Sequence, residues 1–144
     1  MNDSLMIIEK NNIKDLYLEE HNSLCEMLGG LYPNRNPEDI LDNISQYGCG
    51  IVALLKDKDN KKTLGCAIWK YVIRGYAGKV LHVDTLVTVE KGKGYGKSLV
   101  IYLKYRSEDL DGIQLECPLD NEEAQEFYEA NGFEKRACSY VIKG

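Results

Sequence analysis

The sequence predicts an α/β (α+β) fold with a mixed central sheet and the element order β-α-α-β-β-β-α-β-α-β(β). Two observations predict this class. Helical patterns of apolar residues alternate along the chain with short runs rich in β-branched and aromatic residues. Three such runs follow one another in the middle of the chain, separated only by turns, and a glycine-rich loop joins the third run to a helical pattern. Direct turns favour antiparallel neighbours, whereas strands separated by helices favour parallel ones, so the sheet is expected to be mixed.

The first third of the chain predicts one strand and two helices. Leu5–Glu9 is a short strand-like run. The apolar residues that follow share one helical face: Ile13, Leu16, Tyr17, Leu24 and Leu28. We expect Gly29-Gly30 to end this helix and Leu31–Arg35 to form a loop. Asn36 then caps a second helix, with Pro37 in its first turn.

The middle of the chain predicts a three-stranded meander. Cys49–Lys56 and Thr63–Arg74 read as strands, and the charged segment Asp57–Lys62 reads as the turn between them. After a second turn at Gly75–Lys79, the apolar stretch Val80–Val89 is the third strand and leads directly into the glycine loop.

The last third predicts helix, strand, helix and strand. A helix over Tyr95–Glu108 ends before Asp111-Gly112, and Ile113–Cys117 is a short strand. Asn121–Ala130 reads as a helix with acidic residues early, where the positive end of the helix dipole favours them. Phe133–Lys143 is expected to close the chain as one or two strands.

Length and composition fit a single domain over residues 1–144. The chain has 144 residues, of which 44% are apolar, enough to bury a sizeable core. No apolar run approaches the ~20 residues that span a bilayer, and Met1–Lys14 lacks the pattern of a signal peptide. We therefore expect a cytoplasmic protein without a membrane partner. The net charge of −5 and the lack of a basic stripe count against a nucleic-acid partner.

The cysteines predict neither disulfides nor a metal centre. They are odd in number and form no Cys-x-x-Cys pair: Cys25, Cys49, Cys66, Cys117 and Cys138. This pattern favours buried, reduced thiols. A nucleophilic Cys117 is disfavoured because no histidine lies near it in the sequence, and a chain with two histidines is not expected to hold zinc.

The segment Lys91-Gly-Lys-Gly-Tyr-Gly-Lys-Ser98 has three glycines at alternate positions. Such a loop exposes backbone N–H groups, and at the start of a helix these groups form a site for phosphate. A P-loop needs a glycine where Lys91 stands, and a dinucleotide-binding loop needs a different glycine spacing. A glycine-rich turn without a ligand is the remaining structural alternative.

Two motifs resemble those of the GNAT-type N-acetyltransferases. Lys91-Gly-Lys-Gly-Tyr-Gly96 is similar to the family's Arg/Gln-x-x-Gly-x-Gly/Ala loop, with lysine at the first position. Asn121-Glu-Glu-Ala-Gln-Glu-Phe-Tyr-Glu-Ala-Asn-Gly-Phe133 resembles the family's Asn-x-x-Ala-x-x-Phe-Tyr-x-x-x-Gly-Phe segment. Gly78–Thr88 is similar to the strand that leads into the loop, and the segment from Thr88 to Lys91 is shorter than in the similar bacterial branch. The resemblance implies a GNAT fold.

The resemblance also implies acetyl-CoA as cosubstrate, with no metal. Its pyrophosphate is expected on the N–H groups of Gly92–Gly96, and its pantetheine arm on an unpaired strand edge near Leu86–Thr88. In the family this strand splays from the strand after the loop helix, here Ile113–Cys117. The implied cofactor-binding residues are Leu86, Val87, Thr88, Lys91, Gly92, Lys93, Gly94, Tyr95, Gly96, Lys97 and Asn121.

Acyl transfer to an amine needs a base, an oxyanion donor and an acid for the thiolate. Tyr128 matches the family's general-acid tyrosine, and a backbone N–H near Leu86 or Val87 is the oxyanion donor. Strand alternation would place the residues His82, Asp84, Leu86 and Thr88 on one face, which makes Asp84 the candidate base, directly or through water. His82 could assist, and Glu116 is the reserve carboxylate. By family analogy the acceptor site involves the first two helices and residues 29–36, with Tyr32, Asn34 and Arg35 as candidate contacts.

These features together predict an N-acetyltransferase. It would transfer an acetyl group from acetyl-CoA to a primary amine of a small molecule or peptide, by direct attack in a ternary complex. The alternative from the binding class is an acyl-CoA-binding protein or sensor without significant transferase activity, and a nucleotide hydrolase is the runner-up. Exposed strand edges in this fold often pair across a homodimer, so a dimer is the oligomer that the resemblance suggests.

Overall fold

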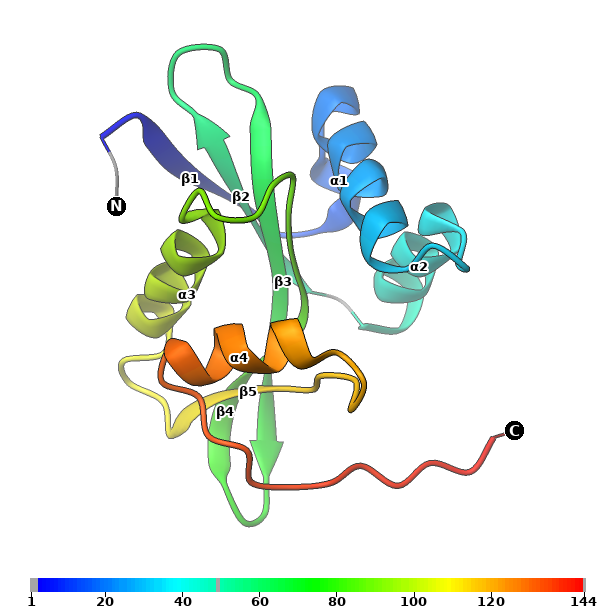
Figure 1. Ribbon diagram of the computed structural model, residues 1–144, viewed down its shortest axis with the longest axis vertical. Coiled ribbons are helices and arrows are strands. Elements are labelled where there is room, and N and C mark those ends of the chain that lie inside the picture. The colour runs from blue at the N-terminus through cyan, green and yellow to red at the C-terminus, as the bar shows by residue number, and fades with distance from the viewer. Residues whose placement is uncertain (1–2, 49, 144) are drawn as a thin grey trace.

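The computed structural model describes residues 3–48 and 50–143, and it confirms the predicted class (Figure 1). The elements in order are β1 (Leu5–Lys10), the 3-10 turn η1 (Ile13–Asp15), α1 (Leu18–Leu31), α2 (Pro37–Asn43), the π-helical turn η2 (Ile44–Gly48), β2 (Ile51–Asp57), β3 (Thr63–Arg74), β4 (Gly78–Thr88), α3 (Tyr95–Arg106), β5 (Gly112–Leu115) and α4 (Glu122–Ala130). No helix in the described part of the chain is long and apolar enough to cross a membrane.

The five strands form one mixed sheet in the order β1-β2-β3-β4-β5. β1 to β4 are antiparallel neighbours, and β5 pairs with β4 in parallel after the crossover through α3. The parallel pairing is short, because β5 contacts only the first half of β4, from Val80 to Val83. Among the described residues, the second half of β4 therefore has a strand partner only on the β3 side.

Helices cover both faces of the sheet (Figure 1). One face packs against α1 and α2 through a cluster that includes Leu24, Met27, Leu28, Leu41, Val52, Leu54, Ile68 and Val87. The other face packs against α3 through a cluster that includes Leu55, Ala67, Trp69, Leu81, Val83, Leu99 and Leu103. The sheet is thus the middle of three layers, and alternate residues of each central strand supply the two cores.

A buried ion pair fastens α1 to β2. The carboxylate of Glu20 is 1% exposed and lies 2.5 Å from Lys56 Nζ, whose side chain is 8% exposed. Glu20 also accepts a hydrogen bond from the backbone N–H of Tyr17 at 2.8 Å, which fixes the first turn of the helix. This buried pair holds α1 at one position along the strand, because a shift of the helix would separate two charges that are shielded from water.

The first helix differs from its predicted bounds at both ends. Ile13–Asp15 forms a separate 3-10 turn, because the Asn12 side chain accepts the N–H of Lys14 at 3.0 Å and starts a short helix there. The α-helix then begins at Leu18 and continues through Gly29 and Gly30 to Leu31. The expected stop at the glycine pair is therefore wrong; glycine costs a helix only about 1 kcal/mol, which packing can offset.

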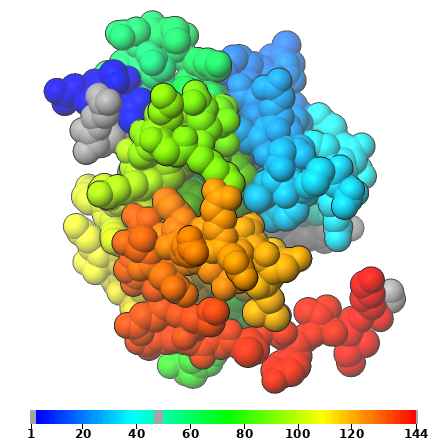
Figure 2. All heavy atoms as spheres, viewed as in Figure 1, coloured from blue at the N-terminus to red at the C-terminus, as the bar shows by residue number. Residues whose placement is uncertain are grey.

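The closing strand expected over Phe133–Lys143 is absent from the described residues, which have no strand pairing there. The backbone N–H of Phe133 bonds to the Tyr128 carbonyl, and Lys135 Nζ lies 3.3 Å from Gln125 Oε1, so the chain first follows α4 instead of β5. It then extends away from the body of the molecule (Figures 1 and 2).

Other boundaries shift by a few residues. β2 begins at Ile51, and the predicted start at Cys49 lies outside the described residues. β4 covers Gly78–Thr88 instead of Val80–Val89, and α3 ends at Arg106 instead of Glu108. β5 is likewise Gly112–Leu115 instead of Ile113–Cys117.

The cysteines also differ from the expectation of buried thiols. Cys66 is buried in the core, whereas Cys25 and Cys117 are half-buried and Cys138 is exposed. All four are free thiols. The prediction fails because cysteine is short enough to sit at the margin of a helix or loop without filling the core.

Candidate active site

The glycine-rich loop turns the chain from β4 into α3. Gly92 and Gly94 have φ angles of 77° and 80°, in the left-handed region that glycine adopts without strain. Gly94 is the N-cap residue of α3, and no side chain caps the helix there. The sequence therefore leaves the positive end of α3 open at this point.

Within the described chain, the backbone N–H groups of residues 92–97 donate no hydrogen bond. The first bond of the helix runs from the Ser98 N–H to the Gly94 carbonyl at 3.0 Å. Lys91, Lys93 and Lys97 belong to the same segment, and their side chains are exposed. Unpaired N–H groups at a helix N-terminus, with cations beside them, form a site for an anion such as a pyrophosphate.

Gly96 serves a different purpose from the other two glycines. It lies inside α3, and a Cβ added there would come within 2.9 Å of Phe127 Cζ on α4. The ring of Phe127 thus occupies the space that any side chain at position 96 would need. A second link joins the loop to α4, since Lys91 Nζ lies 2.9 Å from Glu123 Oε1 between two exposed side chains. α4 therefore rests directly against the start of α3.

The strand edge next to this loop is open, as predicted. β5 pairs with β4 only as far as Val83, so no strand of the described chain (residues 3–48 and 50–143) pairs with Leu86–Thr88 on that side. Their other side pairs with β3, where Leu86 lies opposite Ala67 and Thr88 opposite Gly65. A β-strand edge exposes alternating N–H and carbonyl groups, and an amide-containing ligand can pair with them as a further strand would. The open edge runs straight into the free N–H groups of the loop.

A bulge in β4 changes the faces on which its residues lie. Thr85 is opposite Ile68 and Val83 is opposite Trp69, so Asp84 is an extra residue without a partner on β3. Leu81 and Val83 pack in the core under α3, whereas Val87 packs in the core under α1 and α2. The predicted common face for His82, Asp84, Leu86 and Thr88 is therefore wrong, because an unpaired residue resets the alternation.

The bulge places Asp84 and Thr85 together in a hollow of about 550 Å³. The remaining lining residues are Tyr32, Arg35, Ile40, Asn43, Ile44 and Lys70. The sequence predicted Tyr32 and Arg35 near the acceptor; it also predicted Asn34, which does not line this hollow. The sequence did not predict Lys70, although it is the register partner of His82 on the neighbouring strand.

His82 lies close to Asp84 without a hydrogen bond between them. The distance from His82 Nε2 to Asp84 Oδ1 is 3.6 Å, with the side chains 13% and 27% exposed. His82 Nδ1 is buried and has no partner among the described residues. A buried donor or acceptor without a partner costs free energy, so this ring has an unused hydrogen-bonding group beside the candidate base.

Tyr128 is held by aromatic contacts. Its ring meets Phe127 and Phe133 edge-on, at centroid distances of 5.5 and 5.6 Å. Burial raises the pKa of Tyr128 to about 12, with smaller contributions from electrostatic repulsion by Cys117 and Tyr32. The phenol therefore stays protonated at neutral pH, and no protein group in the described chain hydrogen-bonds to its hydroxyl. Tyr32 interacts electrostatically with Tyr128, and it also lines the hollow with Asp84. Both candidate catalytic residues therefore border the same region.

Three other candidates have clear structural positions. Asn121 caps α4, with its Oδ1 accepting the Ala124 N–H at 3.1 Å. Glu116 is exposed and lies beyond the end of β5 instead of within it. Burial raises the pKa of Cys117, and its thiol lies near the carbonyls of Pro118 and Asn121. A thiol with a raised pKa is a poor nucleophile, which agrees with the sequence-based expectation.

The sequence model of the acetyltransferase (GNAT) family matches residues 13–133. No curated protein matches the chain significantly. A solved ribosomal-protein-alanine N-acetyltransferase from Brucella melitensis biovar Abortus 2308 is 18% identical, with a TM-score of 0.72 over 97% of this chain and 99% of that one. An integron cassette protein from the mobile metagenome of V. cholerae is 17% identical, with a TM-score of 0.79 over 99% and 94%. An aminoglycoside N-acetyltransferase in complex with CoA is 12% identical, with a TM-score of 0.72 over 97% and 94%.

Proposed function

The chain belongs to the acetyltransferase (GNAT) family, and we propose that it transfers an acetyl group from acetyl-CoA to a primary amine of a small molecule or peptide. The amine attacks the thioester directly while both substrates are bound. The helices of both layers pack on one sheet, which supports the further proposal that residues 1–144 act as a single domain.

One observation carries this proposal: the open edge of β4 leads directly to the free N–H groups at the start of α3. A long ligand with amides at one end and a pyrophosphate at the other fits both features at once. The edge at Leu86–Thr88 would pair with the amides, and the donors of residues 92–97 would bind the pyrophosphate. A free phosphate alone would leave the strand edge unused.

Acetyl-CoA supplies the thioester from which the acetyl group is taken. A backbone N–H near Leu86 or Val87 would donate to the oxyanion that develops during transfer. Tyr128 would donate its hydroxyl hydrogen to the departing sulfur. With a pKa of about 12 it is a weaker acid than an ordinary thiol of pKa ~8.5, so its first contribution is a hydrogen bond that stabilises the thiolate.

Asp84 would receive the amine. A primary ammonium must lose a proton before it can attack, and the carboxylate of Asp84 is the anionic group that lines the hollow. Its neighbours Arg35 and Lys70 are cationic, so the hollow suits an acceptor that carries a negative or polar group at some distance from its amine. The proton passes to Asp84 directly or through a water molecule.

A thiol-release assay with acetyl-CoA and a panel of amines, amino acids and peptides tests the proposal. We expect turnover with at least one acceptor, and a fall in kcat of roughly 100-fold or more in Tyr128→Phe. Tyr105→Phe is the matched control, because Tyr105 is an exposed residue of α3, and it should retain full activity. Tight CoA binding without turnover across the panel would contradict the transferase and favour an acyl-CoA sensor.

A further inference from the structure

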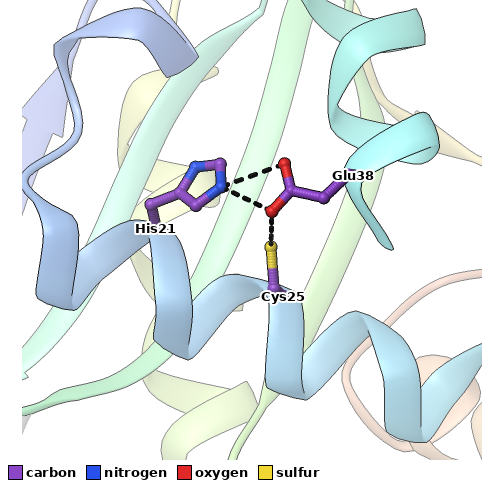
Figure 3. Close-up of side chains that lie close together, drawn as sticks. All are labelled: His21, Cys25 and Glu38. Atoms are coloured by element: carbon purple, nitrogen blue, oxygen red, sulfur yellow. Dashed lines mark hydrogen bonds and ion pairs between the residues drawn. The ribbon is translucent and has the colours of Figure 1, made fainter. Parts of the chain in front are cut away.

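Three potential metal ligands meet where α1 faces α2 (Figure 3). His21 and Cys25 are one helical turn apart on α1, and Glu38 lies in the first turn of α2. Their side chains point toward one another, and one ligand atom from each lies within 4.8 Å of the other two. Nothing in the proposed acetyl transfer uses these residues.

The distances are close to those of a tetrahedral site. His21 Nε2 lies 2.9 and 3.2 Å from the two carboxylate oxygens of Glu38, and Cys25 Sγ lies 3.3 Å from Oε1. Around a zinc ion with bond lengths of 2.0–2.3 Å, neighbouring ligand atoms are about 3.3–3.6 Å apart. Small side-chain rotations would therefore open the hydrogen-bonded cluster far enough to admit an ion.

The donor set suits zinc by its chemistry. Imidazole nitrogen, thiolate sulfur and carboxylate oxygen are the three ligand types that zinc takes in proteins. The side chain of Glu38 is 59% exposed, and an exposed glutamate is ionised at neutral pH. With a neutral imidazole, one thiolate and one carboxylate, a divalent ion leaves the site with no net charge.

The surroundings give access and support. The side chains of His21 and Glu38 are 31% and 59% exposed, so an ion and a water ligand can reach them. The Asn36 side chain accepts the Glu38 backbone N–H at 2.9 Å and fixes the start of α2. The ligands therefore come from two elements that are positioned before any ion binds.

We propose that His21, Cys25 and Glu38 form a zinc site that fastens α2 to α1, with water as the fourth ligand. Without the ion, the Cys25 thiol donates a hydrogen bond to Glu38 Oε1 at 3.3 Å. Binding replaces this proton, so one thiol proton is released for each ion bound. The site differs from the sequence-based expectation, which disfavoured zinc because the chain has two histidines; here one histidine is joined by a thiol and by a carboxylate from a separate helix.

The ion would stabilise the wall of the hollow that contains Asp84. Ile40 and Asn43 of α2 line that hollow, as do Tyr32 and Arg35 just after α1. α2 is only seven residues long and contributes one buried side chain, Leu41, to the core. A link through Glu38 would therefore add to a weakly held element. The zinc site stands independently of acetyl transfer and is tested without it.

Cobalt binding to the full, reduced chain tests the proposal. We expect one Co²⁺ per chain, with a thiolate-to-cobalt charge-transfer band in the near ultraviolet that Zn²⁺ removes. Cys25→Ser should abolish the band, whereas Cys138→Ser, which removes an exposed thiol far from the cluster in sequence, should retain it. A band that persists in Cys25→Ser, or no band at stoichiometric metal, would overturn the assignment.

Thermal unfolding gives a second readout that does not depend on the cobalt spectrum. Zinc at 100 times its Kd should raise the Tm of the unaltered chain by roughly 10 °C and that of Cys25→Ser by none. Glu38→Gln keeps the size of the side chain and should weaken binding by more than about 10-fold. Equal shifts in all variants would show that zinc binds elsewhere and would refute the site.

Discussion

The contact between Gly96 and Phe127 predicts that Gly96→Ala disturbs the position of α4. The new Cβ would lie 2.9 Å from Phe127 Cζ and 3.2 Å from Cε1. Carbon atoms pack at about 3.7 Å, so the ring must retreat by roughly 0.8 Å. The neighbouring residue on α4 is Tyr128, and its ring touches that of Phe127. The substitution should therefore move the proposed general acid.

The expected magnitude follows from two opposing effects. Overpacking costs about 1–3 kcal/mol, and exchanging glycine for alanine in a helix stabilises the helix by about 1 kcal/mol. The net loss of stability is then roughly 0–2 kcal/mol, or a fall in Tm of up to about 8 °C for a chain of this length. A misplacement approaching 1 Å lowers kcat far more, by up to about 100-fold.

Steady-state kinetics and thermal unfolding of Gly96→Ala, Phe127→Leu and the double variant test this prediction. Phe127→Leu removes the ring atoms that meet the new Cβ, so the double variant Gly96→Ala/Phe127→Leu should recover kcat relative to Gly96→Ala alone. Gly96→Ala with unchanged kcat and unchanged Tm would refute the steric reasoning. A double variant no better than Gly96→Ala would show that the contact with Phe127 does not cause the loss of kcat.

Three further predictions concern stability and ligand binding. Lys56→Met removes the nearer cation from the buried Glu20 carboxylate and leaves Lys10 Nζ at 3.9 Å, so it should cost up to about 3–5 kcal/mol. Glu20→Met/Lys56→Met should recover most of this loss, as measured by urea unfolding with Trp69 fluorescence. The raised pKa of Tyr128 contributes stability that is fully present below pH 10 and is lost as the pH rises toward 12. The loss, up to about 2 kcal/mol, should be absent in Tyr128→Phe, and equal curves of unfolding free energy against pH for the two chains would contradict it. Gly94→Ala imposes a side chain at a φ of 80°, so isothermal titration should show weaker CoA binding than in the unaltered chain, and an unchanged Kd would show that this loop does not hold the cofactor.

Local signals in the sequence were sufficient for much of the fold. Thr63–Arg74 was predicted with the bounds of β3, because charged and glycine-containing turns mark both of its ends. Asn36 and Asn121 were expected at helix starts, and both side chains accept a backbone N–H of the first turn. Such caps depend on residues two or three positions away, so a short stretch of sequence contains all the information they need.

Features that depend on distant partners were missed. The bulge at Asp84 is a shift in the register between β4 and β3, at Ile68 and Trp69, and nothing within Gly78–Thr88 marks the extra residue. The His21–Cys25–Glu38 cluster forms because α2 packs beside α1, at a sequence separation of 17 between His21 and Glu38. Both features arise from tertiary contacts, which a residue-by-residue reading of periodicity does not contain.

The bulge also sets how the length of β4 can vary between related or engineered chains. Leu81 and Val83, which precede Asp84, pack in the layer under α3, and Val87 after it packs in the layer under α1 and α2. Exchanging Asp84 for another residue alters the chemistry at one point and leaves both layers filled. Deleting it would turn Thr85–Thr88 over, so that Val87 would face the α3 layer and Leu86 the layer under α1 and α2, and it would shorten the approach to the glycine loop by one residue. In an alignment of such chains, we therefore expect substitutions at position 84 to be more common than deletions of it.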